Sequence, residues 1–460
     1  MVMIGIKNSM NKIWSNEKEI LEFAQKLEGH TVAEMNSPYA LTGSNKHKGK
    51  GKFGQYVENE YFGIETNNSP EADFYPIPLE LKTTGLKTDK KGNLSPKERM
   101  PLSMIDYNQV VNETFDNSHF TAKNSAVLMI WYLYERGQAN SERLIKLADI
   151  WECLKEDREQ IERDFLYIQN KIKDGKAHEL SEGDTLYLGA CTKGDKASNL
   201  REQPNSPIMA RRRAFCFKQP YMRYIWQTMI DRKKNRSNKN IESFCKPGQS
   251  LEEAIAERFH QYIGMRTDEL CRIFEVKNHT KSTYSSLAKE ILGADHKSLV
   301  KKFKEFKAAD LQIKCMRLNV NGKSCESMSF PAMDYCEIAG QDWEDSDLYM
   351  WLTRKFICPV FQQLEDGSDE YYLKSIKVWN MPENDLEIVE QVWLDTKNKI
   401  IAGDYDHFIG SGKRMVAHVR PHDRKALYNT PTPQGILQKK KSFWLNDNYI
   451  NVAILEAIDL

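Results

Sequence analysis

Apolar positions recur at helical spacing in two segments near the start of the chain. In residues 17–27 they follow a possible helix cap at Ser15 or Asn16. In residues 53–63, FGQYVENEYFG, the aromatic and aliphatic side chains fall about three or four positions apart. This spacing places them on one side of a helix. The pattern therefore predicts a helix in each segment.

Strand patterns follow these helices. Residues 79–82, LELK, alternate between apolar and charged side chains, which is typical of a half-buried strand. Residues 126–134, AVLMIWYLY, form an unbroken apolar run that predicts a strand buried on both faces. Residues 142–174 are highly charged, and we expect them to be helical.

The second half of the sequence repeats the pattern of the first half. Three segments echo earlier ones: 252–264 echoes 53–63, 310–330 echoes 79–104, and 343–361 echoes 113–132. A repeat period of about 230 residues indicates a duplicated domain rather than a solenoid. The basic, Pro-Gly-containing stretch between the halves predicts a linker. We expect an N-terminal domain, a linker and a C-terminal domain, at residues 1–231, 232–248 and 249–460.

Composition excludes a membrane protein and favours a reducing compartment. No segment of the 460 residues is as long and apolar as a membrane helix requires, and the first residues lack the pattern of a signal peptide. The nine cysteines are odd in number and contain no CxxC pair. We therefore expect free thiols, no cysteine zinc site and a cytoplasmic protein.

Positive charge is local rather than global, because the net charge is only +1. Basic runs occur at residues 46–52, 211–213, 231–240 and 439–441. Each run can be an ordinary solvated surface, but a few well-placed cations are enough to contact phosphates. Near-neutral charge therefore does not exclude DNA binding.

One acidic and basic cluster carries candidate chemistry. Glu80 and Lys82 project from the same face of the predicted strand, and Asp73 precedes them by a Pro-containing turn. Glu58, on the predicted helix, can complete a group of carboxylates. Carboxylate oxygens suit Mg²⁺, which can activate water and stabilise the leaving oxygen in phosphodiester hydrolysis. We expect Asp73, Glu80 and the Leu81 carbonyl as metal ligands, with Lys82 positioning or deprotonating water.

The spacing alone leaves a simpler alternative open, namely a solvated strand edge with a surface ion pair of little energetic value. Other candidates are weaker. His178 fits a structural role, Cys191 has no evident base partner, and GKGKFG lacks the spacing of a nucleotide-phosphate loop. We therefore predict no use of ATP.

The segments GKGKFGQYVE, SPEADF and LELKTT resemble the mismatch-repair nicking endonuclease MutH. Residues 175–194 and 214–218 also resemble this family, and best of all the Sau-type GATC-specific type II restriction endonucleases. In that family a MutH-like half is followed by a second, degenerate half. The resemblance implies an α/β fold: two tandem restriction-endonuclease-like domains, each a mixed central sheet flanked by helices. It also implies cleavage of duplex GATC, 5′ of the G.

The resemblance assigns roles to individual residues. Glu58, Asp73, Glu80 and Lys82 would be catalytic, and Lys123 would contact phosphate or water. Lys48 would meet a phosphate. Lys193 and Gly194 lie in the segment that matches the DNA-reading loop, where the family's Arg-Pro-Lys run is reduced here to its lysine. Lysine can donate to guanine in the major groove.

The second half departs from the catalytic pattern but keeps the DNA-reading one. Gln312 replaces Glu80, and a neutral amide cannot supply an anionic ligand. Glu305 and Glu257 stand where Asp73 and Glu58 would, and Trp351 stands opposite Lys123. Arg420 and His422 lie in a run that resembles the reading loop. We expect this half to bind a second GATC without cutting and to activate the first half. A decayed copy that only packs is the alternative.

One catalytic half per chain suggests that two chains meet transiently on DNA, because a palindrome presents two equivalent strands. Two rival functions stay open. A nicking enzyme of mismatch repair would act with partner proteins, and a non-catalytic regulator would bind GATC without cleaving it.

Overall fold

The computed structural model describes residues 13–41, 52–65, 71–89, 91–152, 157–194, 199–235, 241–280, 282–324, 326–413, 415–421, 429–457 and 459–460. It divides into two units. The first contains residues up to His178 together with Tyr187–Asn238, and the second contains Glu179–Leu186 together with Lys239–Leu460. Lys48 and His422 lie outside the described residues, so their predicted roles stay predictions.

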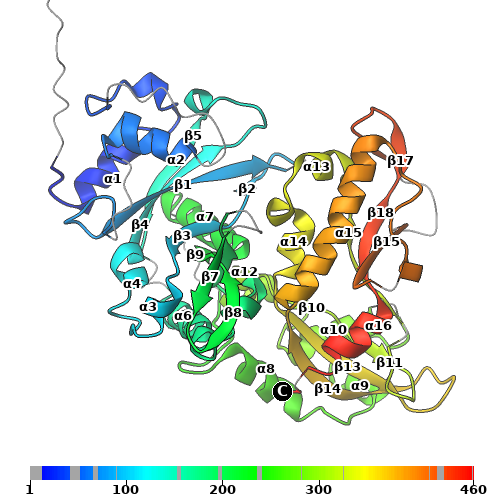
Figure 1. The fold of residues 1–460 in the computed structure, drawn as a ribbon. Helices are drawn as coiled ribbons and strands as arrows, with labels where there is room; N and C mark the ends of the chain where they lie inside the picture. The colour runs from blue at the N-terminus through cyan, green and yellow to red at the C-terminus, as the bar shows by residue number, and fades with distance from the viewer. Residues whose placement is uncertain are drawn as a thin grey trace, which may run out of the picture. The chain divides into compact units, whose positions relative to one another are not determined.

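The first unit is built on a four-stranded sheet in the order β2-β1-β4-β5 (Figure 1). The central pair β1 and β4 is parallel, and β2 and β5 are antiparallel to their neighbours. Its elements before the second sheet are α1 (Glu17–Gln25), η1 (Ala33–Met35), α2 (Lys52–Val57), η2 (Glu58–Phe62), β1 (Leu79–Thr88), β2 (Leu94–Pro96), α3 (Tyr107–Val110), α4 (His119–Asn124), β4 (Ala126–Leu133), η3 (Asn140–Glu142), β5 (Ile145–Trp151) and α6 (Arg158–Lys173).

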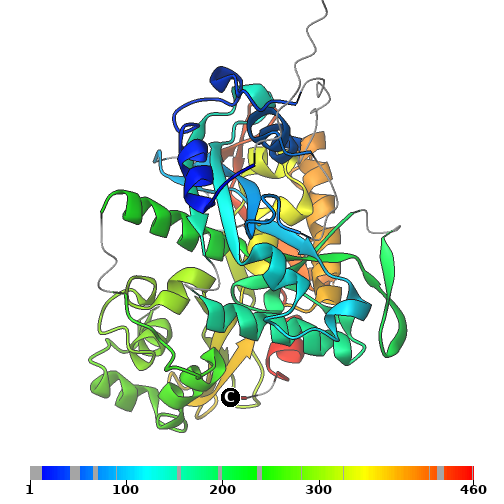
Figure 2. The same ribbon diagram turned by 90° about the vertical axis from the view of Figure 1, so that its left-hand side faces the viewer.

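A three-stranded sheet in the order β3-β9-β6 and a separate two-stranded hairpin complete this unit. The hairpin stands away from the sheets as a green ribbon in Figure 2. The elements are β3 (Met100–Met104), η4 (Ala177–Glu179), β6 (Leu188–Thr192), β7 (Leu200–Gln203), β8 (Ser206–Arg211), β9 (Arg213–Phe217) and α7 (Gln219–Lys233).

Several predicted elements of this unit are confirmed. Asn16 caps α1 by accepting from the Glu19 N–H at 3.0 Å. The segment 53–63 is helical, with a π-helical last turn. The apolar run at β4 is central in its sheet and almost entirely buried.

The prediction of a helix throughout residues 142–174 was wrong for its first part. Ile145–Trp151 is strand β5, which pairs antiparallel with β4, and only Arg158–Lys173 is helical. Ile145, Leu147 and Trp151 are buried. Tertiary pairing at the edge of the sheet therefore decides the conformation of a charged segment whose local pattern is ambiguous.

The second unit repeats the sheets of the first. β13 pairs with β10 and β11 in parallel and with β14 in antiparallel, as β4 pairs with β1 and β5. The order β12-β18-β15 matches β3-β9-β6, and hairpin β16-β17 matches β7-β8. Its elements are η5 (Glu182–Asp184), α8 (Leu251–His260), α9 (Thr267–Ile273), α10 (Thr283–Ile291), α11 (Leu299–Lys302), α12 (Lys304–Ala309), β10 (Gln312–Ile313), β11 (Met316–Leu318), β12 (Met328–Ala332), α13 (Tyr335–Gly340), η6 (Trp343–Asp345), α14 (Asp347–Leu352), β13 (Phe356–Gln363), β14 (Tyr371–Trp379), α15 (Glu383–Ala402), η7 (Ser411–Lys413), β15 (Ala417–Pro421), β16 (Asn429–Pro431), β17 (Leu437–Lys439), β18 (Lys441–Leu445), α16 (Asp447–Tyr449) and η8 (Ile450–Ile454).

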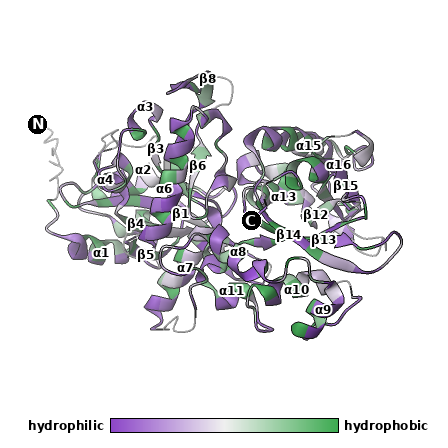
Figure 3. Cartoon of the chain, turned by 90° about the horizontal axis from the view of Figure 1, so that it is seen from below, coloured by the Kyte–Doolittle hydropathy of each residue, from purple (hydrophilic) through white to green (hydrophobic). Residues whose placement is uncertain are grey.

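The long helices α6 and α15 are the counterparts of one another in the two units. Each carries apolar and polar residues, coloured green and purple in Figure 3. Their buried faces include Phe165 and Ile168 in α6, and Val389 and Trp393 in α15. An amphipathic helix of this kind covers a sheet on one side and faces water on the other. The repeated architecture is therefore two mixed α/β domains in tandem, as predicted.

The division into units differs from the predicted boundaries in the segment 179–186. Ser181 Oγ donates to the Met381 carbonyl at 3.1 Å, and the Tyr349 hydroxyl donates to Glu182 Oε1 at 2.9 Å. These polar side chains are buried, so they require such partners. The segment therefore belongs to the second unit although it lies within the first half of the sequence.

Part of the predicted linker is also structured. Phe244 is buried, its ring packs against Phe303 and Phe306, and the Arg258 guanidinium lies over it at 3.7 Å. Residues 241–248 therefore form part of the second unit. In the part of the chain that the structure describes, no helix has the length and apolar character needed to span a bilayer.

Candidate active site

Asp73 and Glu80 are joined by two reciprocal hydrogen bonds at the start of β1. The Asp73 N–H donates to Glu80 Oε2 at 3.2 Å, and the Leu81 N–H donates to Asp73 Oδ2 at 2.9 Å. The turn between them folds the chain back on itself, with Phe74 N–H donating to the Leu79 carbonyl. The two carboxylates are therefore held side by side by the backbone, as the sequence predicts.

Two lysines approach the carboxylate of Glu80. Lys82, two positions along the same strand face, contacts Glu80 Oε1. Lys123 Nζ, from α4, lies 3.7 Å from the same oxygen. Leu79 and Leu81 point the opposite way, into a core with Phe53 and Val57. The alternation of β1 thus separates a packing face from a polar face.

Burial makes this cluster electrostatically unusual. Glu80 is only 1% exposed, and its burial raises its pKa, against the opposing effect of Lys82. Burial also raises the pKa of Glu58 to about 7, and the nearby Asp73 carboxylate raises it further while Lys82 lowers it. Glu58 therefore faces the same group of charges from helix η2. Perturbed carboxylates of this kind are typical of functional sites.

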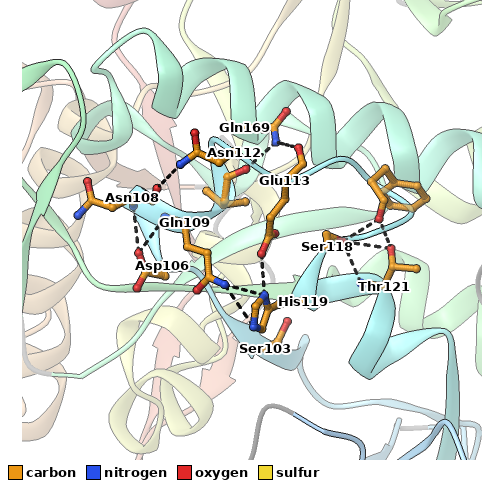
Figure 4. Close-up of polar contacts among 12 residues, drawn as sticks. Ser103, Asp106, Asn108, Gln109, Asn112, Glu113, Ser118, His119, Thr121 and Gln169 are labelled. Atoms are coloured by element: carbon orange, nitrogen blue, oxygen red, sulfur yellow. Dashed lines mark hydrogen bonds and ion pairs between the residues drawn. The ribbon is translucent and has the colours of Figure 1, made fainter.

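Helix α4 brings Lys123 to the cluster, and its start is firmly fixed (Figure 4). Ser118 caps the helix by accepting from the Thr121 N–H at 3.0 Å, and its hydroxyl donates to the Phe115 carbonyl at 2.8 Å. Beside the cap, His119 Nδ1 lies 2.7 Å from Glu113 Oε1. These contacts set where the short helix begins and hence where Lys123 lies.

The donor set fits a hard divalent cation. Asp73 and Glu80 offer adjacent carboxylate oxygens, and a cation would offset the raised pKa of the buried Glu80. Three acidic, histidine or cysteine side chains do not gather into a preformed metal site anywhere in the described residues. Two carboxylates and a carbonyl nevertheless suit Mg²⁺, because this ion keeps several of its waters. The structure therefore brings all five predicted catalytic residues together.

The predicted DNA-reading residues of the first unit follow β6, in the smaller sheet. The Lys193 N–H donates to the Arg212 carbonyl at 2.9 Å. Gly194 has φ +83°, and a side chain there would meet Asn199. A glycine is therefore required where the chain turns away from the sheet. In the second unit, the Arg420 guanidinium stacks on the Trp444 ring at 3.6 Å.

The second unit replaces the acidic cluster with an internal ion pair. Gln312 faces Phe356 in the strand register, as Glu80 faces Val127. The Gln312 amide donates to the Asp310 side chain at 3.0 Å, and Asp310 pairs with the buried Arg354 at 3.0 Å. Sequence comparison of the halves missed Arg354, because it lies just after the helix α14 that replaces Lys123 by Trp351.

Two acids expected to persist in the second unit have other partners. Glu305 accepts from the Phe244 N–H and the Ser243 hydroxyl, both at 2.7 Å, so it fixes the segment before α8. Glu257 is exposed and pairs with Lys246. Neither residue makes a described contact with Gln312, so their expected placement beside it was wrong. Lys314 donates to the Ser329 carbonyl at 3.0 Å, and burial lowers its pKa.

Comparison with known proteins agrees with this repeated architecture. The family model described as DNA mismatch repair enzyme MutH matches residues 62–164 and 292–391, one range in each unit. The repeated sheets and the carboxylate-lysine cluster thus define a protein with two MutH-like, restriction-endonuclease-like domains. The chain belongs to the family of type II restriction endonucleases that includes Sau3AI, and it is an enzyme of that class.

The relatives differ in how much of the chain they cover. The type II restriction enzyme Sau3AI of Staphylococcus aureus is 33% identical, over 95% of this chain and 97% of its own length. The DNA mismatch repair protein MutH of Vibrio campbellii is 27% identical, over 46% of this chain and 92% of its own length. MutH of Escherichia coli is also 27% identical, over 40% and 80%. MutH thus corresponds to less than half of this chain, whereas Sau3AI spans both units.

Proposed function

We propose that this enzyme hydrolyses DNA at the duplex sequence GATC, 5′ of the G, with Mg²⁺ as cofactor. The observation that carries this proposal is the meeting of Asp73, Glu80 and Lys82 at one end of β1. Similarity to Sau3AI over both units supports a restriction enzyme rather than a nicking enzyme. Its cysteines that the structure describes are free thiols, which supports action in the cytoplasm.

In this proposal Asp73, Glu80 and the Leu81 carbonyl hold Mg²⁺, which supplies charge stabilisation and a more acidic water. Lys82 orients that water or accepts its proton, and its charge opposes the charge that develops on the phosphate. Glu58 supports the water network and is poised for proton exchange, since its pKa is about 7. Lys123 contacts the phosphate or the attacking water.

The second unit has a different role. We infer that it binds a second GATC site through Arg420 and His422 and favours the active state of the first unit. The Asp310–Arg354 pair supports this role, because an internal guanidinium stands where a cation would otherwise be needed. Cleavage of both strands would then bring two chains together transiently on one palindrome.

A plasmid with several GATC sites and Mg²⁺ tests the central proposal. The purified protein alone should convert supercoiled plasmid to linear fragments, and sequencing of the ends should place the cut 5′ of the G. A matched plasmid in which every GATC is changed to GTAC should stay intact. Nicked circles without linear product would favour a nicking enzyme, and binding without cleavage under any divalent ion would favour a regulator.

A further inference from the structure

Both units carry the same pattern along the second strand of their hairpin. Two aliphatic residues, one spacer and three cations form PIMARRRAF in the first unit and GILQKKKSF in the second. The aliphatic pairs Ile208–Met209 and Ile436–Leu437 are 228 residues apart (208 to 436). The pattern has survived in a unit that has lost its acidic cluster. Its role is therefore separate from the cleavage chemistry.

The aliphatic pairs are exposed in both units. The exposed fractions are 52% and 44% for Ile208 and Met209, and 49% and 62% for Ile436 and Leu437. Each hairpin is two-stranded, with no third strand among the described residues. Neighbouring residues of a strand point to opposite faces, and here both faces are open. Single exposed apolar residues are common, but an equivalent pair in two diverged units calls for a shared partner.

Both hairpins are held in place at their base and at their turn. The Tyr107 hydroxyl donates to the Arg211 carbonyl, and the equivalent Tyr335 donates to the Lys439 carbonyl at 2.6 Å. At the turns, Asn205 Nδ2 donates to the Lys173 carbonyl of α6 and Gln434 Nε2 to the Ile400 carbonyl of α15, both at 2.9 Å. The aliphatic pairs thus lie on ribbons that are already fixed in orientation, which lowers the entropic cost of binding.

The cations behind the aliphatic pairs divide into two kinds. The last of each run faces inward: the buried Arg213 donates to the Ala190 carbonyl at 2.7 Å, and Lys441 contacts the Tyr405 carbonyl. Arg212, Lys439 and Lys440 are exposed. The carbonyl of Arg212 accepts from Lys193, the predicted DNA-reading residue. The exposed cations therefore lie beside the segment where the proposed function places DNA.

We propose that each hairpin is a DNA-binding ribbon whose aliphatic pair contacts a groove and whose exposed cations contact phosphates. A groove of duplex DNA admits a two-stranded ribbon, and aliphatic side chains contact its sugars and base edges. Lysine and arginine at the base of the ribbon match the charge of the backbone. The inference rests on the proposed function only in taking DNA as the ligand, and it adds a contact that both units share.

Fluorescence anisotropy of the full chain with a labelled GATC duplex, with Ca²⁺ in place of Mg²⁺, tests the ribbon. The variants I208S/M209S and I436S/L437S should each bind about tenfold more weakly. A duplex without GATC should show the same loss, because the contact is not base-specific. The matched controls are Leu166→Ser and Leu394→Ser, which change exposed leucines on α6 and α15 that are also 228 residues apart (166 to 394). These controls should bind like the parent.

Charge variants give a second measurement that does not alter the aliphatic pair. Arg212→Gln and Lys440→Gln should each lower the slope of log Kd against log salt by about one. Unchanged Kd values and salt slopes in the hairpin variants would overturn the ribbon. So would equal weakening in the leucine controls. A loss of self-association in the serine variants, with DNA binding intact, would assign the hairpin to a second copy of the chain instead.

The outcomes separate this inference from the proposed function. If the parent protein binds duplexes but never cleaves GATC, the proposed reaction fails while the anisotropy data still decide the ribbon. If the parent cleaves GATC and the hairpin variants bind normally, only the ribbon fails.

Discussion

Lys123 Nζ lies 3.7 Å from Glu80 Oε1, although the two residues come from different elements, α4 and β1. Lys82 contacts the same oxygen from within the strand. A carboxylate buried to this extent is costly unless charges or hydrogen bonds offset it. The two lysines therefore both permit a buried acid at this position and surround the place where a phosphate would lie.

Removal of the negative charge of Glu80 should abolish cleavage without unfolding the protein. Glu80→Gln keeps the size of the side chain but removes an anionic ligand, so the cleavage rate should fall more than about 100-fold. The melting temperature without metal should not fall, because a neutral amide is easier to bury than a carboxylate. Single-turnover cleavage and thermal melting measure the two effects.

A matched control for this variant is Glu98→Gln, which changes a glutamate paired with Lys97 outside the cluster. Its cleavage rate should equal that of the parent. Normal cleavage by Glu80→Gln would remove Glu80 from the chemistry, and equal losses in both variants would point to a general effect on folding.

The two lysines should contribute unequally. Lys82 contacts Glu80 directly and shares its strand face, whereas Lys123 lies further away and on another element. Lys82→Met should lower the single-turnover rate by about 10²–10³-fold, the range found for the loss of one stabilising donor. Lys123→Met should cost roughly tenfold, as expected for a supporting contact. The reverse order would show that Lys123, and not Lys82, positions the attacking water.

Glu58 should make the metal-free protein less stable as the pH rises. The pKa of Glu58 is raised to about 7 in the folded protein from 4.5, mainly by burial. The folded state therefore holds a proton that the unfolded state releases between these values. The associated stability is present below about pH 4.5 and is lost as the pH approaches 7, with an upper limit of about 3 kcal/mol.

Urea unfolding at a series of pH values measures this linkage. Between pH 5 and 8 the unfolding free energy of the parent should fall, and that of Glu58→Gln should fall less, because the amide does not titrate. Added Mg²⁺ should reduce the fall in the parent, since a cation favours the ionised carboxylate. Parallel pH profiles for the two proteins would contradict the raised pKa.

The sequence predicted the acidic cluster because its elements are local and strongly patterned. Glu80 and Lys82 alternate with buried leucines, and the Pro-containing turn returns Asp73 to them. Strand β5 was mistaken for helix because its pairing with β4 is not written in its own pattern. The Asp310–Arg354 pair could not be foreseen, since it depends on which side chain fills the space left by a missing carboxylate.

Two of the wrong predictions concern segments that form contacts with distant parts of the chain. Residues 179–186 contact Met381 and Tyr349, and Glu305 binds residues 243–245. Such contacts join residues more than 60 positions apart, so neither helical nor strand periodicity reports them. The spacing of 228 residues between the halves was a stronger signal, and it also marks the two hairpins.

The effector role of the second unit predicts a dependence on the number of sites. If that unit binds a second GATC and favours the active state, the parent should cleave a two-site plasmid faster than a one-site plasmid. The coupling free energy expected for such an effect is about 1–3 kcal/mol, which corresponds to roughly 5–150-fold. Arg420→Ala removes the guanidinium that stacks on Trp444 and should abolish the difference by slowing cleavage of the two-site plasmid.

Arg272→Ala is the matched control, because Arg272 is an exposed arginine on α9 of the same unit. It should keep the preference for two sites. A short GATC duplex added in trans should stimulate the parent on the one-site plasmid but not Arg420→Ala. Equal rates of the parent on both plasmids, with no stimulation in trans, would leave the second unit as a packing partner and contradict the effector role.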